Sequence, residues 1–389
     1  MIKRLLEKTE KFFEKGGKLE VFFPVYDMLV TMAFVSPERT KSGAHIRDYY
    51  DIKRLMISVI FAGLPAFFFG IYNTGYQYFV SQGINAGFID IMIEGAWLVI
   101  PILVVAYGVG GFWEVIFAMI RKHEVNEGLL VTGFLIPLIV PPTIPLWQVA
   151  VATSFGVIVG KEVFGGTGMN VFNPALVARA FLFFAYPAAI SGDSVWVATG
   201  SKVVDTFSGA TPLAVASLKN TTPVVEALAD RGYGFMDMFI GLIPGSIGET
   251  STLLILLGAM FLIVNGVASW RIIVSVFTGG IVMALVLNAF APTPESMLAL
   301  PPHYHLVMGG FAFGAVFMAT DPVSSSATMA GQYVYGFMIG LLAVLVRVLN
   351  PAYPEGMMLA ILFMNAFAPL IDNIVVWNNI RRRKQRATE

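Results

Sequence analysis

Long apolar runs dominate this sequence, and they leave few folds open to it. From Leu55 onward, apolar blocks follow one another with short polar or glycine-rich breaks between them. Blocks of roughly 17 to 25 apolar residues are what a helix needs to cross the hydrocarbon core of a bilayer. Hydrophobic residues make up 57% of the 389 residues and charged residues only 13%, which is too apolar for a soluble globular protein. We therefore expect an all-α, polytopic membrane protein.

The apolar pattern predicts about ten transmembrane helices in two halves of five. The expected spans are 55–72, 95–120, 129–146, 147–164, 171–190, 251–268, 272–291, 306–320, 332–349 and 355–376. Between the halves, the glycines and the proline of 236–249 predict a broken or re-entrant helix. Five spans per half would make the halves an inverted repeat. However, the motif at 140–156 resembles the one at 291–314, and this count gives the matched helices the same direction, so either a span is miscounted or the likeness is accidental.

Five regions follow from this pattern. They are an amphipathic N-terminal segment at 1–54, a first transmembrane half at 55–190, an outer loop with the re-entrant segment at 191–250, a second half at 251–376 and a basic tail at 377–389. The N-terminal segment interleaves apolar and basic residues, so it is expected to lie on an anionic membrane surface rather than to act as a signal peptide.

The distribution of basic residues predicts the orientation in the membrane. Most Lys and Arg lie in the first 54 residues and the last nine, and Arg121, Lys122 and Arg271 are also basic residues near span ends. Because loops rich in Lys and Arg stay in the cytoplasm, both termini are expected there. The 191–235 loop then lies on the outer face.

The sequence contains no cysteine, and this excludes several kinds of redox chemistry in the chain. A disulfide, a Cys-ligated iron–sulfur cluster and thiol chemistry all need this residue. The four histidines are scattered, and His303 and His305, beside Pro301 and Pro302, are better explained by an interfacial loop than by a metal site. Any electron carrier here is expected to be organic or held by other ligands.

The stretch from Asp205 to Pro212 reads Asp-Thr-Phe-Ser-Gly-Ala-Thr-Pro and stands alone between hydrophobic blocks. Thr211 precedes a proline, which favours an extended backbone, and Gly209 can adopt conformations closed to other residues. The segment is therefore expected to present the Thr211 hydroxyl among small neighbours. A simple turn explains the same composition. The motif also resembles the flavinylation signal, on which a dedicated transferase places FMN through a phosphoester to the last threonine.

Three carboxylates lie inside or at the ends of expected spans. Glu114 follows Gly110 and Gly111 in an apolar run, where an ionisable side chain usually has a functional partner or faces a cavity. Alternatively, the span ends earlier and Glu114 reaches the cytoplasmic interface. Asp321 and Asp372 supply oxygen ligands that suit sodium, although Asp321 fits a helix cap at least as well.

A glycine-rich break at 161–174 separates two expected spans. Its glycines permit close backbone approach, and Asn170 and Asn173 offer donors and acceptors that suit the edge of an isoalloxazine ring. The alternative is a polar cytoplasmic turn in which Asn173 caps the helix that begins at Pro174. Arg179 lies inside the following span and can sit beside an anionic flavin or one of the acids.

Taken together, these features resemble the B subunits of sodium-translocating NADH:quinone oxidoreductases. The resemblance covers essentially the whole chain. It rests on the basic N-terminal segment, the Gly-Gly-x-x-Glu span, 123–128, the 165–175 block, Ser208-Gly209-Ala210-Thr211 and the late Asp-Pro and Asp-Asn pairs.

The resemblance implies a subunit with a urea-transporter-like fold in a six-subunit complex of the bacterial inner membrane. Electrons from NADH would pass through partner subunits to FMN on Thr211 in the periplasmic loop, then to riboflavin in this subunit and finally to ubiquinone, and Na⁺ would move outward. It implies a quinone site at Gly110, Gly111 and Lys53, a sodium path at Glu114, Asp321 and Asp372, and riboflavin contacts at Asn170 and Asn173.

Two other functions stay open at this point. The D subunit of the related ferredoxin:NAD electron-transport complex shares the motif and the fold, but it usually lacks a basic extension as long as 1–54. A solute channel of the urea-transporter type needs a continuous pore and no flavin.

Overall fold

The computed structural model describes residues 52–121, 128–199, 207–218, 221–350 and 355–388, and these ranges contain helices and no β-strand. The first half holds α3 (Ile52–Ser81), α4 (Phe88–Arg121), α5 (Gly128–Leu138), α6 (Leu146–Ile158), the 3₁₀ turn η2 (Glu162–Phe164), α7 (Pro174–Ala185) and α8 (Pro187–Ile190). The middle holds α9 (Pro212–Ser217), α10 (Val224–Asp230) and α11 (Phe235–Ile240). The second half holds α12 (Thr252–Val264), α13 (Trp270–Ala289), η3 (Met297–Ala299), α14 (Pro302–Val307), α15 (Phe311–Phe313), the π-helical turn η4 (Gly314–Met318), α16 (Met329–Leu349) and α17 (Met357–Thr388).

Within the described residues, six helices are long and apolar enough to cross a membrane. They are α3, α4, α13, α16, α17 and a helix from Leu146 to Phe164 that includes α6. The chain is thus a polytopic helical membrane protein, as its composition predicts.

The other four expected spans differ in length from the prediction. Helices α5, α7 and α12 have 11, 12 and 13 residues, which at 1.5 Å per residue cover roughly half of a bilayer core. The fourth, 306–320, consists of the short elements α14, α15 and η4. Proline is one cause, because Pro141, Pro142 and Pro145 follow α5 and cannot continue its hydrogen-bond ladder.

The broken backbone after α5 is covered by the 241–250 segment. The Gly248 N–H donates to the Leu138 carbonyl at 2.7 Å, and the Ile247 N–H donates to the Val140 carbonyl at 3.2 Å. The Asn73 amide of α3 donates to the Ile243 carbonyl at 2.9 Å. Irregular backbone is tolerated at membrane depth when protein groups satisfy it in this way.

Glycines allow the long helices to cross closely. Gly75 and Gly95 bring the backbones of α3 and α4 together, and Gly279 and Gly340 do the same for α13 and α16. A Cβ atom at any of these four positions would collide with a backbone carbonyl of the facing helix. Small residues at such crossings are a common way for helices to associate in a membrane.

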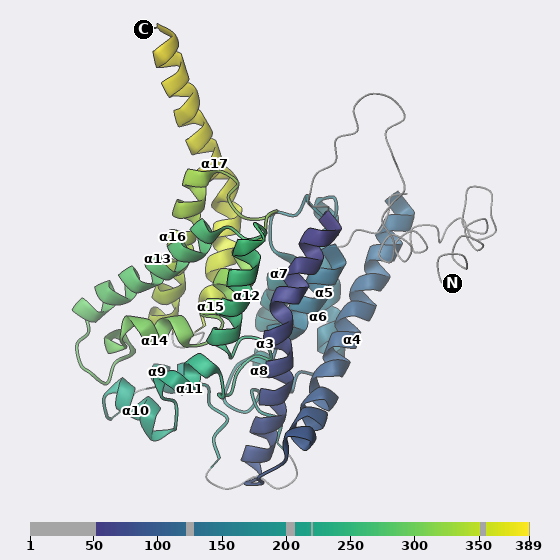
Figure 1. Cartoon of the computed structure of the whole chain (residues 1–389), viewed down its shortest axis with the longest axis vertical. Helices are drawn as coiled ribbons and strands as arrows, with labels where there is room; N and C mark the ends of the chain where they lie inside the picture. The colour runs from purple at the N-terminus through teal and green to yellow at the C-terminus, as the bar shows by residue number, and fades with distance from the viewer. Residues whose placement is uncertain (1–51, 122–127, 200–206, 219–220, 351–354, 389) are drawn as a thin grey trace, which may run out of the picture.

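The two ends of the helical bundle differ in charge and in content. Figure 1 shows the start of α3, the end of α4 and the projecting end of α17 at one end, and α9, α10 and α11 toward the other. The first end carries Arg54, Arg121 and 381–384, and we call it the basic end. The other carries Thr211 at the start of α9, and we call it the Thr211 end.

Candidate functional site

Thr211 is the N-cap of helix α9. Its backbone is extended, with φ −70° and ψ 156°, and its Oγ1 accepts a hydrogen bond from the Ala214 N–H at 3.2 Å. Pro212 occupies the first helical position, where its missing N–H is not needed. The local sequence therefore sets both the extended backbone and the cap, and the half-buried hydroxyl faces a pocket.

The residues before Thr211 are held in place by two neighbouring segments. A Cβ atom on Gly209 would lie 2.6 Å from the Asp193 carbonyl oxygen, so this approach requires glycine. The buried Ala210 accepts a hydrogen bond from the Tyr233 hydroxyl at 2.8 Å. Burial raises the pKa of Tyr233, so the phenol stays protonated as a donor at neutral pH. Ser208 is exposed, its Oγ accepting from the Ala210 N–H at 3.4 Å. The expected motif residue Asp205 lies outside the described residues.

The pocket beside Thr211, the Thr211 pocket, has a volume of about 250 Å³. Its rim includes the exposed Asp193 and the half-exposed Trp196, and its floor includes the buried Arg179 and Glu249. The pocket therefore joins the motif of the middle segment to charged groups in the core.

The floor is an ion-pair network centred on Arg179. Its Nη1 lies 2.7 Å from Glu249 Oε1 and its Nη2 lies 2.6 Å from Glu355 Oε2. The side chains are 5%, 7% and 13% exposed, in the order Arg179, Glu249, Glu355. The sequence left open whether Arg179 adjoins a flavin or an acid. The structure pairs it with two acids that the sequence analysis did not single out, on the wall of the Thr211 pocket.

A second arginine, Arg347 of α16, fixes the neighbouring backbone. It is fully buried and donates to the carbonyls of His305 at 2.6 Å, Met308 at 3.1 Å and Glu355 at 3.3 Å. Gly309, with φ +60°, follows Met308 and lines the Thr211 pocket. This arginine thus shapes the pocket without facing it.

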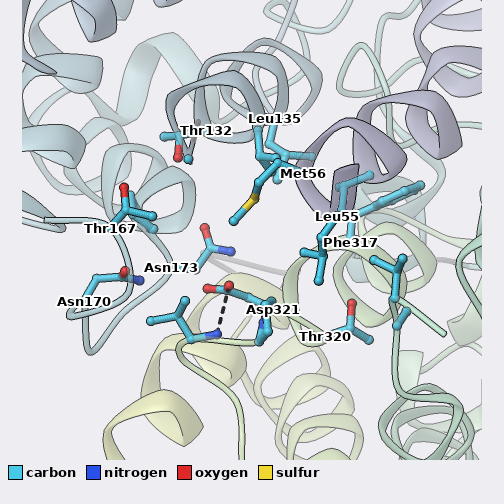
Figure 2. Close-up of a pocket in the computed structure, with 18 of the residues that line it drawn as sticks. Leu55, Met56, Thr132, Leu135, Thr167, Asn170, Asn173, Phe317, Thr320 and Asp321 are labelled. Atoms are coloured by element: carbon cyan, nitrogen blue, oxygen red, sulfur yellow. Dashed lines mark hydrogen bonds between the residues drawn. The ribbon is translucent and has the colours of Figure 1, made fainter. Parts of the chain in front are cut away.

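The other pocket that bears on the sequence analysis lies at the basic end and has a volume of about 80 Å³. Figure 2 shows Asn170, Asn173 and Asp321 around it, and we call it the asparagine pocket. Leu55 and Met56, at the start of α3, also line it, which places it at the basic end.

The polar residues of this pocket also have structural roles. Asn173 Oδ1 accepts from the N–H groups of Ala175 at 3.0 Å and Leu176 at 3.4 Å, so the helix-capping alternative holds for this residue. Asn170 donates to the Phe172 carbonyl at 2.9 Å. Asp321 accepts from the Val323 N–H at 3.3 Å and from the Ser324 hydroxyl at 2.7 Å. These bonds hold a turn, and the next helix, α16, begins only at Met329, so Asp321 does not cap a helix.

Glu114 is buried and forms an ion pair with Lys161. Helix α4 continues beyond Glu114 to Arg121, and the Glu114 carboxylate is buried against a charged partner, as the first interpretation expects. Lys161 also lines the asparagine pocket. Next to this pair, Arg121 Nη1 lies 2.8 Å from Glu162 Oε2. Two ion pairs therefore tie the end of α4 to the break at 161–174.

The predicted quinone residues lie against a neighbouring helix. A Cβ atom on Gly110 would lie 2.8 Å from Leu129 Cδ1, and one on Gly111 would lie 3.6 Å from Leu129 Cδ2. Gly110 thus allows α4 to pack closely on α5, whereas a Cβ atom at Gly111 would make only an ordinary contact. The side chain of Lys53 lies outside the described residues, and the quinone site stays a prediction.

Asp372 lies apart from the other two predicted sodium residues. Its carboxylate accepts from the hydroxyl of Ser326 at 2.7 Å and from the N–H groups of Ala327 at 2.8 Å and Thr328 at 2.9 Å. These contacts secure the start of α16. Asp321 lines the asparagine pocket and Glu114 adjoins it through Lys161, whereas Asp372 lines neither pocket.

The charged partners were missed by the sequence analysis for a specific reason. Lys161, Glu162, Glu249 and Glu355 lie at breaks between apolar runs, where charged residues are ordinarily solvated. Arg347 gave a usable signal, because it lies inside an expected span.

In the described part of the chain, no three His, Cys, Asp or Glu side chains are arranged to hold a metal ion. The His303 ring packs edge-on against the Phe235 ring, with the two ring centroids 5.2 Å apart.

Comparison with known proteins gives a family assignment. Residues 39–381 match the model of the NQR2, RnfD, RnfE family. The B subunit of a Na(+)-translocating NADH-quinone reductase from Yersinia pestis is 50% identical over 414 residues, with 99% of each chain covered. The B subunit of the same name from Ectopseudomonas mendocina (strain ymp) is 51% identical over 408 residues, also with 99% of each chain covered. The chain belongs to the NQR2, RnfD, RnfE family.

Proposed function

We propose that this chain is the B subunit of a Na⁺-translocating NADH:quinone oxidoreductase and works as one subunit of that membrane complex. The observation that carries this proposal is about 50% identity, over 99% of both chains, to relatives of that name. This similarity favours the B subunit over the D subunit of the ferredoxin:NAD complex. The polytopic helical fold agrees with a subunit embedded in a bacterial membrane.

The cofactor that we assign to the Thr211 end is FMN, joined to Thr211 through a phosphoester. When bound, FMN supplies a carrier that accepts and releases electrons. The residues present fit this group, because the threonine hydroxyl, the aromatic Trp196 and the guanidinium of Arg179 line one pocket. Its volume of about 250 Å³ lies just below the roughly 300 Å³ at which the range for ligand pockets begins.

Esterification is compatible with the local structure of Thr211. The oxygen acts as a hydrogen-bond acceptor from Ala214, and an ester oxygen keeps a lone pair for this role. The cap of α9 can therefore persist in the flavinylated chain. Thr211 is half-exposed, and this exposure gives a transferase access to the residue.

Riboflavin within this subunit follows from the family resemblance, and its fit to the asparagine pocket is poor. Asn170 and Asn173 have suitable amide groups, but about 80 Å³ holds only a few water molecules, each of roughly 30 Å³ in the liquid. The isoalloxazine ring does not fit there in this arrangement. We derive no electron-transfer step through these two asparagines.

The orientation that we propose places both termini in the cytoplasm and Thr211 in the periplasm. The separation of charge supports it, since the basic end and the Thr211 end lie at opposite ends of the bundle. Electrons from NADH, a cytoplasmic donor, would then have to cross the membrane to reach Thr211. They would return to reduce ubiquinone near Gly110 and Gly111. We propose that this relay involves five partner subunits and is coupled to outward movement of Na⁺ past Glu114, Asp321 and Asp372.

The attachment of FMN can be tested with flavin fluorescence of the denatured chain in a gel. The chain is produced in a host that contains the FMN transferase. We expect the wild type, Thr211→Ser and the control Ser217→Ala, which lies in the same pocket but outside the motif, to fluoresce, and Thr211→Ala to be dark. A dark wild type, or a fluorescent Thr211→Ala chain, would refute the assignment.

A further inference from the structure

The floor of the Thr211 pocket contains more charge than helix packing requires. Arg179 comes from α7, Glu249 from the irregular segment after α11, and Glu355 from the residues just before α17. The guanidinium reaches both carboxylates within 2.7 Å, and all three side chains line the pocket. A purely structural network could be sealed from the pocket, whereas this one forms part of its wall.

The two carboxylates converge on one point of that wall. A Cβ atom on Gly310 would lie 2.6 Å from Glu249 Oε1 and 2.9 Å from Glu355 Oε1. Glycine at this position therefore lets both acids approach the same backbone without an intervening side chain. Any molecule that enters the pocket from Thr211 meets one positive and two negative groups at its floor, all of them largely shielded from water.

A flavin ring is sensitive to such groups. Adding two electrons and one proton to the oxidised ring leaves it with one negative charge, so a nearby cation favours the reduced form and a nearby anion disfavours it. In a partly buried site, these effects are screened less than in water. Charges near the ring are one of the main ways in which a protein tunes a flavin.

We propose that Arg179, together with Glu249 and Glu355, sets the midpoint potential of a flavin attached to Thr211. Arg179 raises the potential by stabilising the added charge. The glutamates lower it and also position the guanidinium. This inference rests on the proposed attachment of FMN to Thr211, and it assigns a role to three residues that lie far apart in the sequence.

The sign of the shift separates this role from simple packing. Replacing Arg179 by Gln should make reduction of the flavin about tenfold less favourable, and replacing Glu249 by Gln should make it about tenfold more favourable. For a two-electron couple, tenfold corresponds to about 30 mV, downward for Arg179→Gln and upward for Glu249→Gln. A packing defect has no reason to move the potential in opposite directions for the two variants.

The matched control is Asp193→Asn. Asp193 is a carboxylate of the same pocket but lies on its exposed rim, so water screens it. This variant makes the same change of charge as Glu249→Gln, and we expect it to alter the equilibrium constant for flavin reduction less than twofold. Arg179→Lys keeps the positive charge and should shift the potential by less than half as much as Arg179→Gln.

The experiment is a spectroelectrochemical titration of the purified complex. The signal of the Thr211 flavin is the difference between each complex and the corresponding complex that carries Thr211→Ala, and in-gel fluorescence confirms attachment in every variant. Opposite shifts for Arg179→Gln and Glu249→Gln, with little change for Asp193→Asn, support the proposal.

Two outcomes would overturn it. Fluorescent variants with unmoved potentials, or with shifts in one direction, refute the role of the network and leave the attachment intact. A dark wild type refutes the attachment itself. If Arg179→Gln does not assemble, Arg179→Lys and Glu355→Gln replace it. An upward shift in Glu355→Gln, which removes a negative charge, with a smaller shift in Arg179→Lys, which keeps its charge, then supports the proposal. An unmoved potential in Glu355→Gln refutes it.

Discussion

Removal of Lys161 should destabilise the chain more than any single change at an exposed basic residue. Lys161 and Glu114 form an ion pair in which the side chains are 2% and 5% exposed. In the Lys161→Ala variant, the Glu114 carboxylate stays buried without this partner. Breaking a buried ion pair from one side costs about 3–5 kcal/mol.

This magnitude translates into a measurable change in melting temperature. Unfolding entropy is roughly 2 cal/mol/K per residue, so a chain of 389 residues should lose roughly 4–6 °C in Tm. The assay is thermal unfolding of the purified protein in detergent, followed by tryptophan fluorescence. Arg383→Ala, at an exposed position of α17, serves as the control and should shift Tm by less than about 1 °C.

A double variant tests the electrostatic cause. Glu114→Gln with Lys161→Met removes both charges and keeps similar volumes, and replacing a buried ion pair by neutral groups is often close to neutral in stability. The double variant should therefore recover most of the lost Tm. A Lys161→Ala chain as stable as wild type would show that the ion pair does not stabilise the fold, and a double variant no more stable than the single one would rule out an unpaired buried charge as the cause.

Two further predictions concern flavin attachment and sodium. Gly209→Ala should lower flavin fluorescence per chain severalfold, because its Cβ atom would lie 2.6 Å from the Asp193 carbonyl oxygen and displace the motif; full fluorescence would show that the close approach is unnecessary. Glu114→Ala and Asp372→Ala should weaken the sodium stimulation of quinone reduction while fluorescence at Thr211 persists. Unchanged sodium dependence in both variants would remove these acids from the sodium path.

The sequence predicted the class of fold well, because the length of apolar runs follows directly from the thickness of a bilayer. It did not predict which spans are shortened. The prolines after α5 are visible in the sequence, but the contact of Gly248 with the Leu138 carbonyl, which makes the break tolerable, joins segments about 110 residues apart. Such pairings depend on tertiary structure and leave no local signal.

The same limit applies to the candidate site. The segment around Thr211 was singled out by its resemblance to the flavinylation signal, since its local chemistry alone also fits a simple turn. Its cap on α9 follows from the extended backbone before Pro212. The residues that complete the pocket come from distant segments. Arg179 was noticed as a cation within an apolar run, whereas its partners Glu249 and Glu355 carried no periodic or motif signal.

The most direct test of flavin attachment is mass spectrometry of the peptide that contains Thr211, from the chain purified out of the membrane complex. We predict that this peptide carries one FMN, added with loss of water, and that fragmentation places the modification on Thr211. An unmodified Thr211 in a complex that reduces quinone at the wild-type rate, or an FMN located on another residue of this chain, would contradict it.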